Sequence, residues 1–195
     1  MNKEYLALGF RNVDTKKDKE AYYHCLHLLD SLPYYQQTKK KSYELLDLHD
    51  GVTLLEAGCG LGHDVFRMAL LVLPDGHITG LDSSKAMIAA AQANPLAAVL
   101  PVGFVQGDIR ELPFCDQSFS RCRVDRTLQH VFEPEAAIAE LIRVLKPGGL
   151  LLAYDNDWET FSIRSRCNET NRTLESLWIH SFASPAIGRH LHKSF

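Results

Sequence analysis

The stretch from Val52 to His63 constrains this chain most, because three glycines at alternate positions directly follow a short apolar run. The run Val52–Leu55 favours a buried strand, and residues 63–73 have helical spacing. Between a strand and a helix, glycines leave room for a ligand to lie against the backbone, and the helix start offers free N–H groups. The stretch therefore predicts a nucleotide-like ligand at this turn, although a turn that merely joins strand to helix stays open.

The spacing of the glycines separates two kinds of nucleotide turn. The dinucleotide fingerprint is G-x-G-x-x-G, but here the third glycine, Gly62, comes one residue early and His63 takes its place. This spacing argues against a nicotinamide-dependent oxidoreductase. The run E-A-G-C-G-L-G at 56–62 resembles motif I of class I S-adenosylmethionine (SAM)-dependent methyltransferases, in which an acidic residue precedes G-x-G-x-G.

This resemblance implies a cofactor-binding role for five residues. The carboxylate of Glu56 serves the cationic end of the methionine part of SAM. The backbone of the turn serves the ligand's oxygens, which adds Gly58, Cys59, Gly60 and Gly62 to the predicted site.

Two later strand ends carry further acidic residues. Residues 77–81 predict a second strand that ends at Asp82, and an acidic residue there accepts hydrogen bonds from ribose hydroxyls. Ser83 follows it and joins the predicted cofactor site. The alternative for Asp82 is an N-cap of the next helix, 84–93, a role that serines also fill.

A third strand is predicted at Val102–Gln106, followed by Asp108 and Ile109. The resemblance implies that Asp108 accepts from the adenine amine and that Ile109 packs beside the base. A plain Asx turn after the strand is the alternative for Asp108.

Residues 121–125 predict a fourth strand, and ligands in such folds lie beyond the carboxyl ends of the strands. Arg126, Gln129 and His130 are therefore expected near the methyl acceptor, with Arg126 also contacting the cofactor. His130 is the candidate catalytic base or orienting residue, because the ordinary pKa of histidine lies near neutrality. A histidine that only caps local backbone is the alternative.

The later chain completes an α/β pattern. A helix is predicted from Pro134 to Leu145, ended by K-P-G-G at 146–149, with a fifth strand at Leu150–Tyr154. Alternating strands and helices predict a doubly wound, Rossmann-like parallel sheet of order 3-2-1-4-5. The joint occurrence of E-A-G-C-G-L-G, L-D, Q-G-D-I and L-K-P-G-G is similar to the methyltransferase type 11 branch, which includes ubiquinone/menaquinone-biosynthesis enzymes.

One domain is predicted, in three parts. Residues 1–50 comprise a loosely held arm, which ends at about residue 20, and the helices that follow it. These helices could lie over the pocket as a lid. Tyr34 and Tyr35 are candidates for that contact, with ordinary packing as the alternative. Residues 51–157 form the SAM-binding core. Residues 158–195 supply a helix at 164–182 and an irregular tail, resembling a truncated family C-terminus that lacks the usual strand hairpin and leaves strand five at an edge.

Composition limits the partners. The net charge of −3 predicts no nucleic-acid or membrane partner, and the basic run 39–41 predicts a solvated helix face. The five cysteines are odd in number and lack C-x-x-C, and no signal peptide is apparent, which predicts a cytoplasmic protein without a zinc site. No metal is expected, and His24 and His27 are taken as ordinary histidines.

The predicted function is that of an enzyme: a SAM-dependent methyltransferase that transfers the sulfonium methyl to an O, N or C nucleophile of a small molecule. A monomer or homodimer is expected. The alternative is a SAM-binding but catalytically impaired fragment or interaction module.

Overall fold

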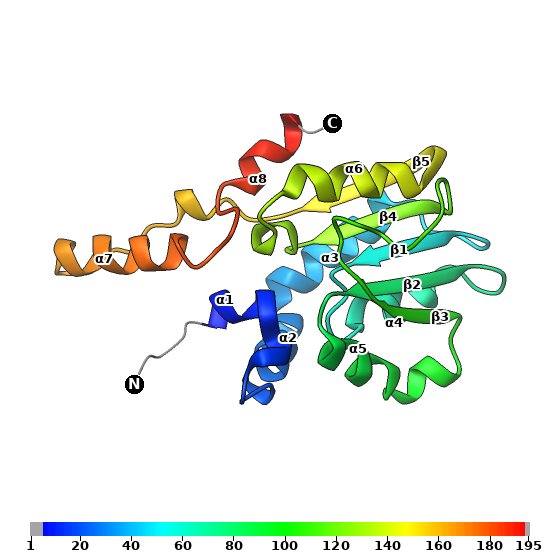
Figure 1. The fold of residues 1–195 in the computed structure, drawn as a ribbon, viewed down its shortest axis with the longest axis horizontal. Coiled ribbons are helices and arrows are strands. Elements are labelled where there is room, and N and C mark those ends of the chain that lie inside the picture. The colour runs from blue at the N-terminus through cyan, green and yellow to red at the C-terminus, as the bar shows by residue number, and fades with distance from the viewer. Residues whose placement is uncertain (1–5, 194–195) are drawn as a thin grey trace.

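The computed structural model describes residues 6–193 as an α/β fold around one five-stranded parallel sheet (Figure 1). The strands are β1 (Thr53–Ala57), β2 (His77–Asp82), β3 (Val102–Gln106), β4 (Phe119–Asp125) and β5 (Leu145–Tyr154). Their order is β3-β2-β1-β4-β5, and every neighbouring pair is parallel. The predicted fold class and strand order are confirmed, and β5 lies at an edge of the sheet.

Helices pack around this sheet, and further helices precede β1 and follow β5 in the chain. The α-helices are α1 (Leu6–Gly9), α2 (Glu20–Ser31), α3 (Pro33–Leu45), α4 (His63–Ala69), α5 (Lys85–Gln92), α6 (Pro134–Val144), α7 (Asn168–Ile179) and α8 (Ile187–His190). The 3₁₀ segments are η1 (Phe10–Thr15), η2 (Pro95–Ala98), η3 (Leu128–His130), η4 (Trp158–Thr160) and η5 (Leu191–Lys193).

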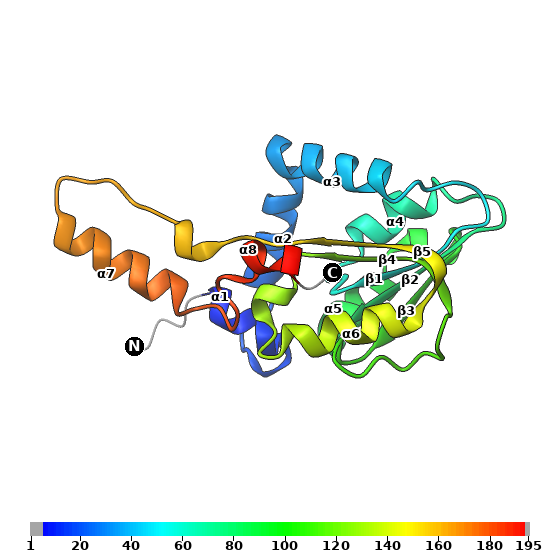
Figure 2. The ribbon, with the colours of Figure 1, turned by 90° about the horizontal axis from the view of Figure 1, so that it is seen from above.

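The core has two layers because successive residues of a strand face opposite sides of the sheet. On β1, Leu54 packs with Val65 and Met68 of α4, whereas Leu55 packs with Ile138 of α6. Figure 2 shows α3 and α4 on one side of the sheet and α6 on the other. Both faces of β1 are thus buried, which explains why two consecutive residues, Leu54 and Leu55, are both apolar.

Several predicted boundaries are wrong. The helix predicted to end before K-P-G-G at 146–149 ends at Val144. Strand five was predicted to begin at Leu150, but β5 already begins at Leu145, which pairs with Phe119 beside a register shift. The predicted helices 63–73 and 164–182 are shorter, as α4 and α7. The tail predicted to be irregular contains α8 and η5.

The N-terminal arm, predicted to be loosely held, is attached to the core at Asp14; residues 1–5 lie outside the described part. The carboxylate of Asp14 accepts hydrogen bonds from the Ser84 hydroxyl (2.8 Å) and from the N–H groups of Lys85 (2.8 Å) and Ala86 (2.9 Å). These N–H groups open α5 and have no acceptor within the helix. Asp14 therefore caps the helix that follows β2.

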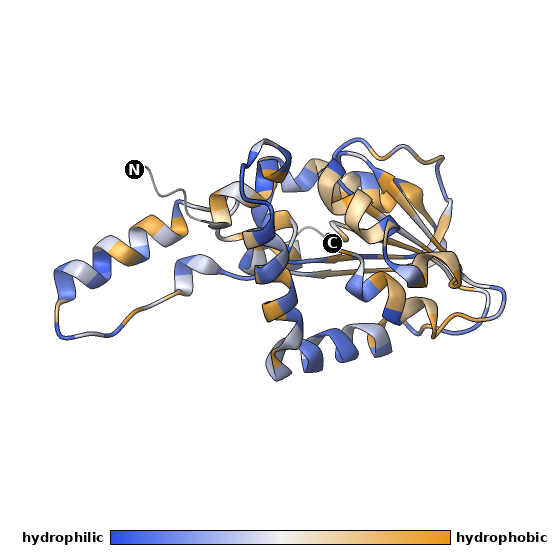
Figure 3. Cartoon of the chain, turned by 90° about the horizontal axis from the view of Figure 1, so that it is seen from below, coloured by the Kyte–Doolittle hydropathy of each residue, from blue (hydrophilic) through white to orange (hydrophobic). Residues whose placement is uncertain are grey.

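Helix α7 extends away from the sheet, at the far end of the molecule from β3 (Figures 1 and 2). In Figure 3 its hydrophilic and hydrophobic residues alternate around the helix. At its base, Trp178 packs against Trp158, Phe161 and Phe182, with ring centroids 5.4–5.9 Å apart. These four rings connect the C-terminal segment to the end of β5.

Candidate cofactor and acceptor site

A cavity of about 780 Å³ opens where the strands end, a size suited to a nucleotide-like ligand and a small substrate. It is also lined by the N-terminal segment, by α2 and α3, and by the aromatic residues of the C-terminal segment. The predicted site residues that line it are Glu56, Gly58, Cys59, Gly60, Asp82, Ser83, Asp108, Ile109, Arg126 and His130. Gly62 does not line the cavity; it precedes α4 and packs near Phe104.

The glycine turn has the backbone conformation that only glycine adopts freely. Gly58, Gly60 and Gly62 have φ values of 78°, 52° and 78°. A Cβ on Gly58 would lie 2.1 Å from the hydroxyl oxygen of Thr127, so β1 and the end of β4 approach closely here. The fold therefore requires glycine at position 58 for two independent reasons.

The turn amides already have acceptors within the protein. The N–H groups of Gly58 and Cys59 donate to the carbonyl of Leu81, and the N–H of Gly62 donates to the carbonyl of Cys59. The turn was expected to serve a ligand's oxygens through its backbone, and for Gly58, Cys59, Gly60 and Gly62 that role stays a prediction.

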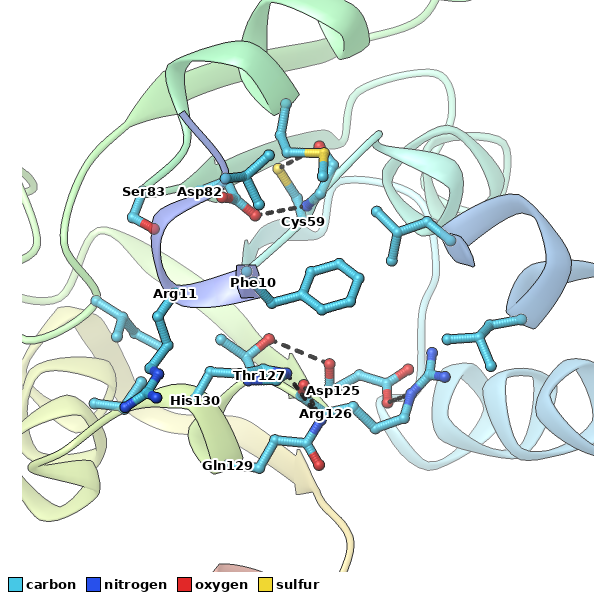
Figure 4. A pocket seen from close by; sticks show the side chains of 18 of the residues that line it. Phe10, Arg11, Cys59, Asp82, Ser83, Asp125, Arg126, Thr127, Gln129 and His130 are labelled. Atoms are coloured by element: carbon cyan, nitrogen blue, oxygen red, sulfur yellow. Dashed lines mark hydrogen bonds and ion pairs between the residues drawn. The ribbon is translucent and has the colours of Figure 1, made fainter. Parts of the chain in front are cut away.

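Asp82 joins the end of β2 to the glycine turn. Its carboxylate accepts from the N–H of Gly60 at 2.8 Å and from that of Ser84 at 2.9 Å. Burial raises the pKa of this carboxyl above its usual value. The N-cap of α5, the alternative role considered for Asp82, is instead Ser84, whose hydroxyl accepts a hydrogen bond from the N–H of Met87. The exposed Ser83 lies beside Asp82 at the cavity (Figure 4).

The end of β3 shows the Asx turn that was the alternative for Asp108, and the adenine contact stays a prediction. Its carboxylate accepts from the backbone N–H of Arg110 at 2.9 Å, which is an Asx turn, and forms an ion pair with the Arg110 guanidinium at 2.6 Å. This hydrogen-bonded pair lowers the pKa of Asp108. Ile109 is buried in the core and also lines the cavity.

A buried ionic cluster lies beneath the glycine turn. Apart from the charged residues of the fourth strand, no sequence pattern indicated it. The guanidinium of Arg123 forms ion pairs with Glu56, with Asp125 (2.7 Å) and with Asp64 (3.3 Å). Burial raises the pKa of Glu56, against the opposing attraction of Arg123. Glu56 is therefore engaged through one oxygen before any ligand binds.

The basic run 39–41 was predicted to be a solvated helix face, and for Lys39 this is wrong. Only 7% of Lys39 is exposed, and its ammonium lies 2.5 Å from Asp64 and 3.4 Å from Asp30. Lys39 lines the cavity, whereas Lys40 and Lys41 are exposed. Periodicity could not identify Lys39, because its acidic partners come from other helices.

Arg126 directs its side chain towards the helices at the cavity. It adopts a φ of 53°, its Nε donates to Asp125 at 2.9 Å, and its guanidinium stacks over the ring of Tyr35 at 4.4 Å. Of the two tyrosines considered for a lid contact, Tyr35 lines the cavity and Tyr34 is 65% exposed.

His130 packs against two aromatic rings that also line the cavity. Its ring centroid is 5.6 Å from those of Phe10 and Phe182. Burial, aided by the positive charge of Arg11, lowers the pKa of His130 to about 4, so the ring is neutral near pH 7. Figure 4 shows Phe10 between the group formed by Asp82, Ser83 and Cys59 and the residues at the end of β4.

Three buried side-chain atoms in the described part of the chain have no hydrogen-bond partner: Glu56 Oε2, His130 Nδ1 and Trp178 Nε1. All three residues line the same cavity. Buried polar groups are almost always paired, because leaving one unpaired costs about 1–3 kcal/mol. Their concentration in one cavity indicates a site whose ligands complete the pairing.

A parallel sheet of this order, with a glycine turn after β1 and acidic residues after β2 and β3, defines the Rossmann-like class I methyltransferase fold. The chain belongs to the methyltransferase domain family, whose sequence model matches residues 48–192. The predicted class, with SAM as its cofactor, is confirmed at the level of the family.

Two curated relatives illustrate the similarity. The demethylmenaquinone methyltransferase of Desulfitobacterium hafniense is 32% identical over 154 residues, which cover 71% of this chain and 60% of that protein. An uncharacterized 37.1 kDa protein in a Streptomyces fradiae transposon is 41% identical over 126 residues, covering 64% of this chain and 36% of that protein. The chain thus spans between about a third and two thirds of the length of such relatives.

Solved structures are similar as well. The [4+2]-cyclase SpnF has 32% identity and a TM-score of 0.57, covering 62% of this chain and 44% of that one. A SAM-dependent methyltransferase from Aquifex aeolicus has 22% identity and a TM-score of 0.58, covering 70% of this chain and 76% of that one. The second similarity concerns the fold alone.

Within residues 6–193, no helix combines the length and the apolar character needed to cross a bilayer. In the same residues, no three or more His, Cys, Asp or Glu side chains are grouped as metal ligands would be. The cytoplasmic location and the monomeric or dimeric state stay predictions.

Proposed function

We propose that this chain binds SAM in the cavity at the strand ends and transfers its methyl group to a small-molecule nucleophile. The observation that carries the proposal is the convergence of Glu56, Asp82 and Ile109, from the ends of three strands, on one cavity. These side chains offer a carboxylate for an ammonium, a carboxylate for ribose hydroxyls and an apolar face for a base.

The unpaired atoms of the cavity fit this cofactor. Glu56 Oε2 is a buried acceptor without a partner, and the ammonium of a methionine group is a donor that matches it. Arg126 offers a positive charge to the cofactor's carboxylate. Asp82 keeps lone pairs for ribose hydroxyls beyond those used by the Gly60 and Ser84 amides, with Ser83 beside it.

The remaining predicted contacts complete the proposed site. Asp108 accepts a hydrogen bond from the adenine amine while its carboxylate also accepts from Arg110. Ile109 packs against the base. Gly58, Cys59 and Gly60 bring the backbone close to the ligand, and Gly62 contributes by turning the chain into α4. When bound, SAM supplies an activated methyl group on sulfur, so the protein's part is alignment and the exclusion of water.

The acceptor half of the cavity differs in character from the cofactor half. It is lined by Phe10, Phe132, Trp158, Trp178 and Phe182 together with His130. This aromatic wall, as defined by these six residues, favours a largely apolar small molecule. His130 is the titratable side chain of the wall and the candidate catalytic residue, as a base or as an orienting group.

Calorimetry with SAM, S-adenosylhomocysteine and NAD tests the cofactor. Binding of the first two without NAD binding is expected, and NAD binding without SAM heat would refute the proposal. Asp82→Ala should weaken SAM binding about 10–100-fold through loss of a charged acceptor. Glu111→Ala, an exposed change outside the cavity lining, is the matched control.

Methyl transfer needs its own experiment, because a similar structure with 32% identity is a [4+2]-cyclase. Incubation with methyl-labelled SAM and a metabolite extract, followed by mass analysis, should yield labelled small molecules. If SAM binds and no labelled product forms with any extract, the chain is a binding module instead.

A further inference from the structure

The side-chain amide of Gln129 has one possible orientation. Trp158 Nε1–H can only donate, and it lies 2.6 Å from Gln129 Oε1, which must therefore be the carbonyl oxygen. The other end of the amide lies 3.0 Å from the carbonyl of Arg126, which can only accept. Both neighbours independently place the NH₂ group of Gln129 on the side of His130.

This orientation fixes the tautomer of His130. Gln129 Nε2 lies 3.1 Å from His130 Nε2, and an amide NH₂ donates but does not accept. His130 Nε2 must therefore carry the lone pair. Since burial lowers the pKa of His130 to about 4, the ring is neutral and its single proton sits on Nδ1.

The Nδ1–H group is a buried donor without a partner in a ligand-sized cavity. Trp178 Nε1–H is a second such donor on the aromatic wall. Both rings contact Phe182, with centroid distances of 5.6 Å. Two neutral donors on an aromatic surface match an oxygen acceptor on an apolar ring, and they offer nothing to an ammonium group.

We propose that His130 Nδ1–H and Trp178 Nε1–H bind oxygen atoms of the substrate, a ring compound bearing a carbonyl or an ionised hydroxyl. Gln129 and Trp158 are positioning residues that hold His130 in the donor tautomer. In this form His130 is a hydrogen-bond donor and not the catalytic base. The assignment of the oxygen to a methyl acceptor rests on the proposed function, whereas the tautomer does not.

Nitrogen-15 NMR of the imidazole tests the tautomer in the unaltered protein. Near pH 7, Nδ1 of His130 should resonate as a protonated nitrogen and Nε2 as an unprotonated one. A ring protonated at Nε2, or an equal mixture of the two tautomers, would overturn the proposal.

The variant Gln129→Glu tests the positioning role. Its carboxylate accepts from Trp158 and also from His130, so the His130 proton should move to Nε2. Gln92→Glu, which adds the same charge on α5, should leave the His130 signals unchanged. If Gln129→Glu retains native circular dichroism and an Nδ1-protonated ring, Gln129 does not set the tautomer.

Binding of a matched pair of probes tests the donor pair. With S-adenosylhomocysteine present, 1-tetralone should bind about tenfold more tightly than tetralin, which lacks the carbonyl. Tetralone should also shift the N–H signals of His130 and Trp178. Equal affinities without these shifts would refute the donor role. Failure of the proposed function would appear separately, as absent SAM binding or absent methyl transfer beside an intact tautomer.

Discussion

The guanidinium of Arg123 on β4 lies against the carboxylate of Glu56 on β1, and the two side chains are only 1% and 4% exposed. The two residues are direct neighbours in the register of the parallel strands. Asp125 and Asp64 also pair with Arg123. Charge is thus buried between β1 and β4, beneath the predicted cofactor turn.

Arg123→Met should destabilise the fold by about 3–5 kcal/mol, because the buried carboxylates lose their shared cation. The free energy of unfolding in urea measures this. Adding Glu56→Gln to Arg123→Met should recover part of the loss, since one unpaired acid is then removed. Arg172→Met on the exposed face of α7 should change stability by less than about 0.5 kcal/mol. An equal, small effect of both arginine substitutions would contradict the prediction.

Gly58→Ala should cost more than Gly51→Ala, although the two glycines have nearly equal φ values of 78° and 80°. An added Cβ meets Thr127 at position 58 and nothing within 4 Å at position 51. At position 51 we expect a loss of stability of about 1 kcal/mol, from backbone conformation alone. At position 58 we expect a loss of about 2–4 kcal/mol, because the clash with Thr127 is added.

The double variant Gly58→Ala/Thr127→Ala isolates the steric part of this cost. In a double-mutant cycle, removing the Thr127 side chain should recover about 1 kcal/mol or more. Strict additivity of the two substitutions in urea unfolding would show that Thr127 does not cause the strain.

Asp14→Ala should release the N-terminal segment from α5. Loss of this cap is expected to cost about 1 kcal/mol, and the amides of Lys85 and Ala86 should exchange with deuterium faster. Asp18→Ala removes only a local bond to Ala21 and should leave the α5 amides protected. Unchanged exchange in Asp14→Ala would show that this cap does not hold the segment.

Asp155 should make stability fall as pH rises. Burial raises its pKa to about 7, although the N–H groups of Gln129 and Asn156 donate to it. The folded state therefore holds a proton that the unfolded chain releases near pH 4. The stabilisation of the fold by protonated Asp155 is complete below about pH 4 and is lost as pH rises through about 7. The total loss of free energy of unfolding amounts to up to about 4 kcal/mol.

Asp155→Asn should remove this pH dependence, and urea unfolding measured between pH 4 and 9 checks it. The exposed variant Asp75→Asn should follow the pH profile of the unaltered protein. Parallel profiles for Asp155→Asn and the unaltered protein would contradict the raised pKa.

The features predicted best are those that depend on short contiguous segments of the sequence. Gly58, Gly60 and Asp82 were identified because a strand and the turn that ends it are contiguous, and strand ends meet at one edge of a parallel sheet. The strand order was predicted from the alternation of strands and helices together with the right-handed crossovers of parallel sheets. The K-P-G-G run marked the end of the helix but not the start of β5, because β4 pairs with the chain as far back as Leu145.

The sequence by itself determined the alternation of strands and helices, the glycine turn and the acidic strand ends, since each depends on local conformation and hydrophobic periodicity. The class I fold followed from the resemblance of these motifs to a known family. Only the tertiary structure decided that Lys39 and Arg123 are buried, because their partner carboxylates come from distant segments. It likewise decided the tautomer of His130, which depends on Trp158 holding Gln129. Pairing of polar groups in a low-dielectric interior is set by neighbours in space, and spacing along the chain does not encode it.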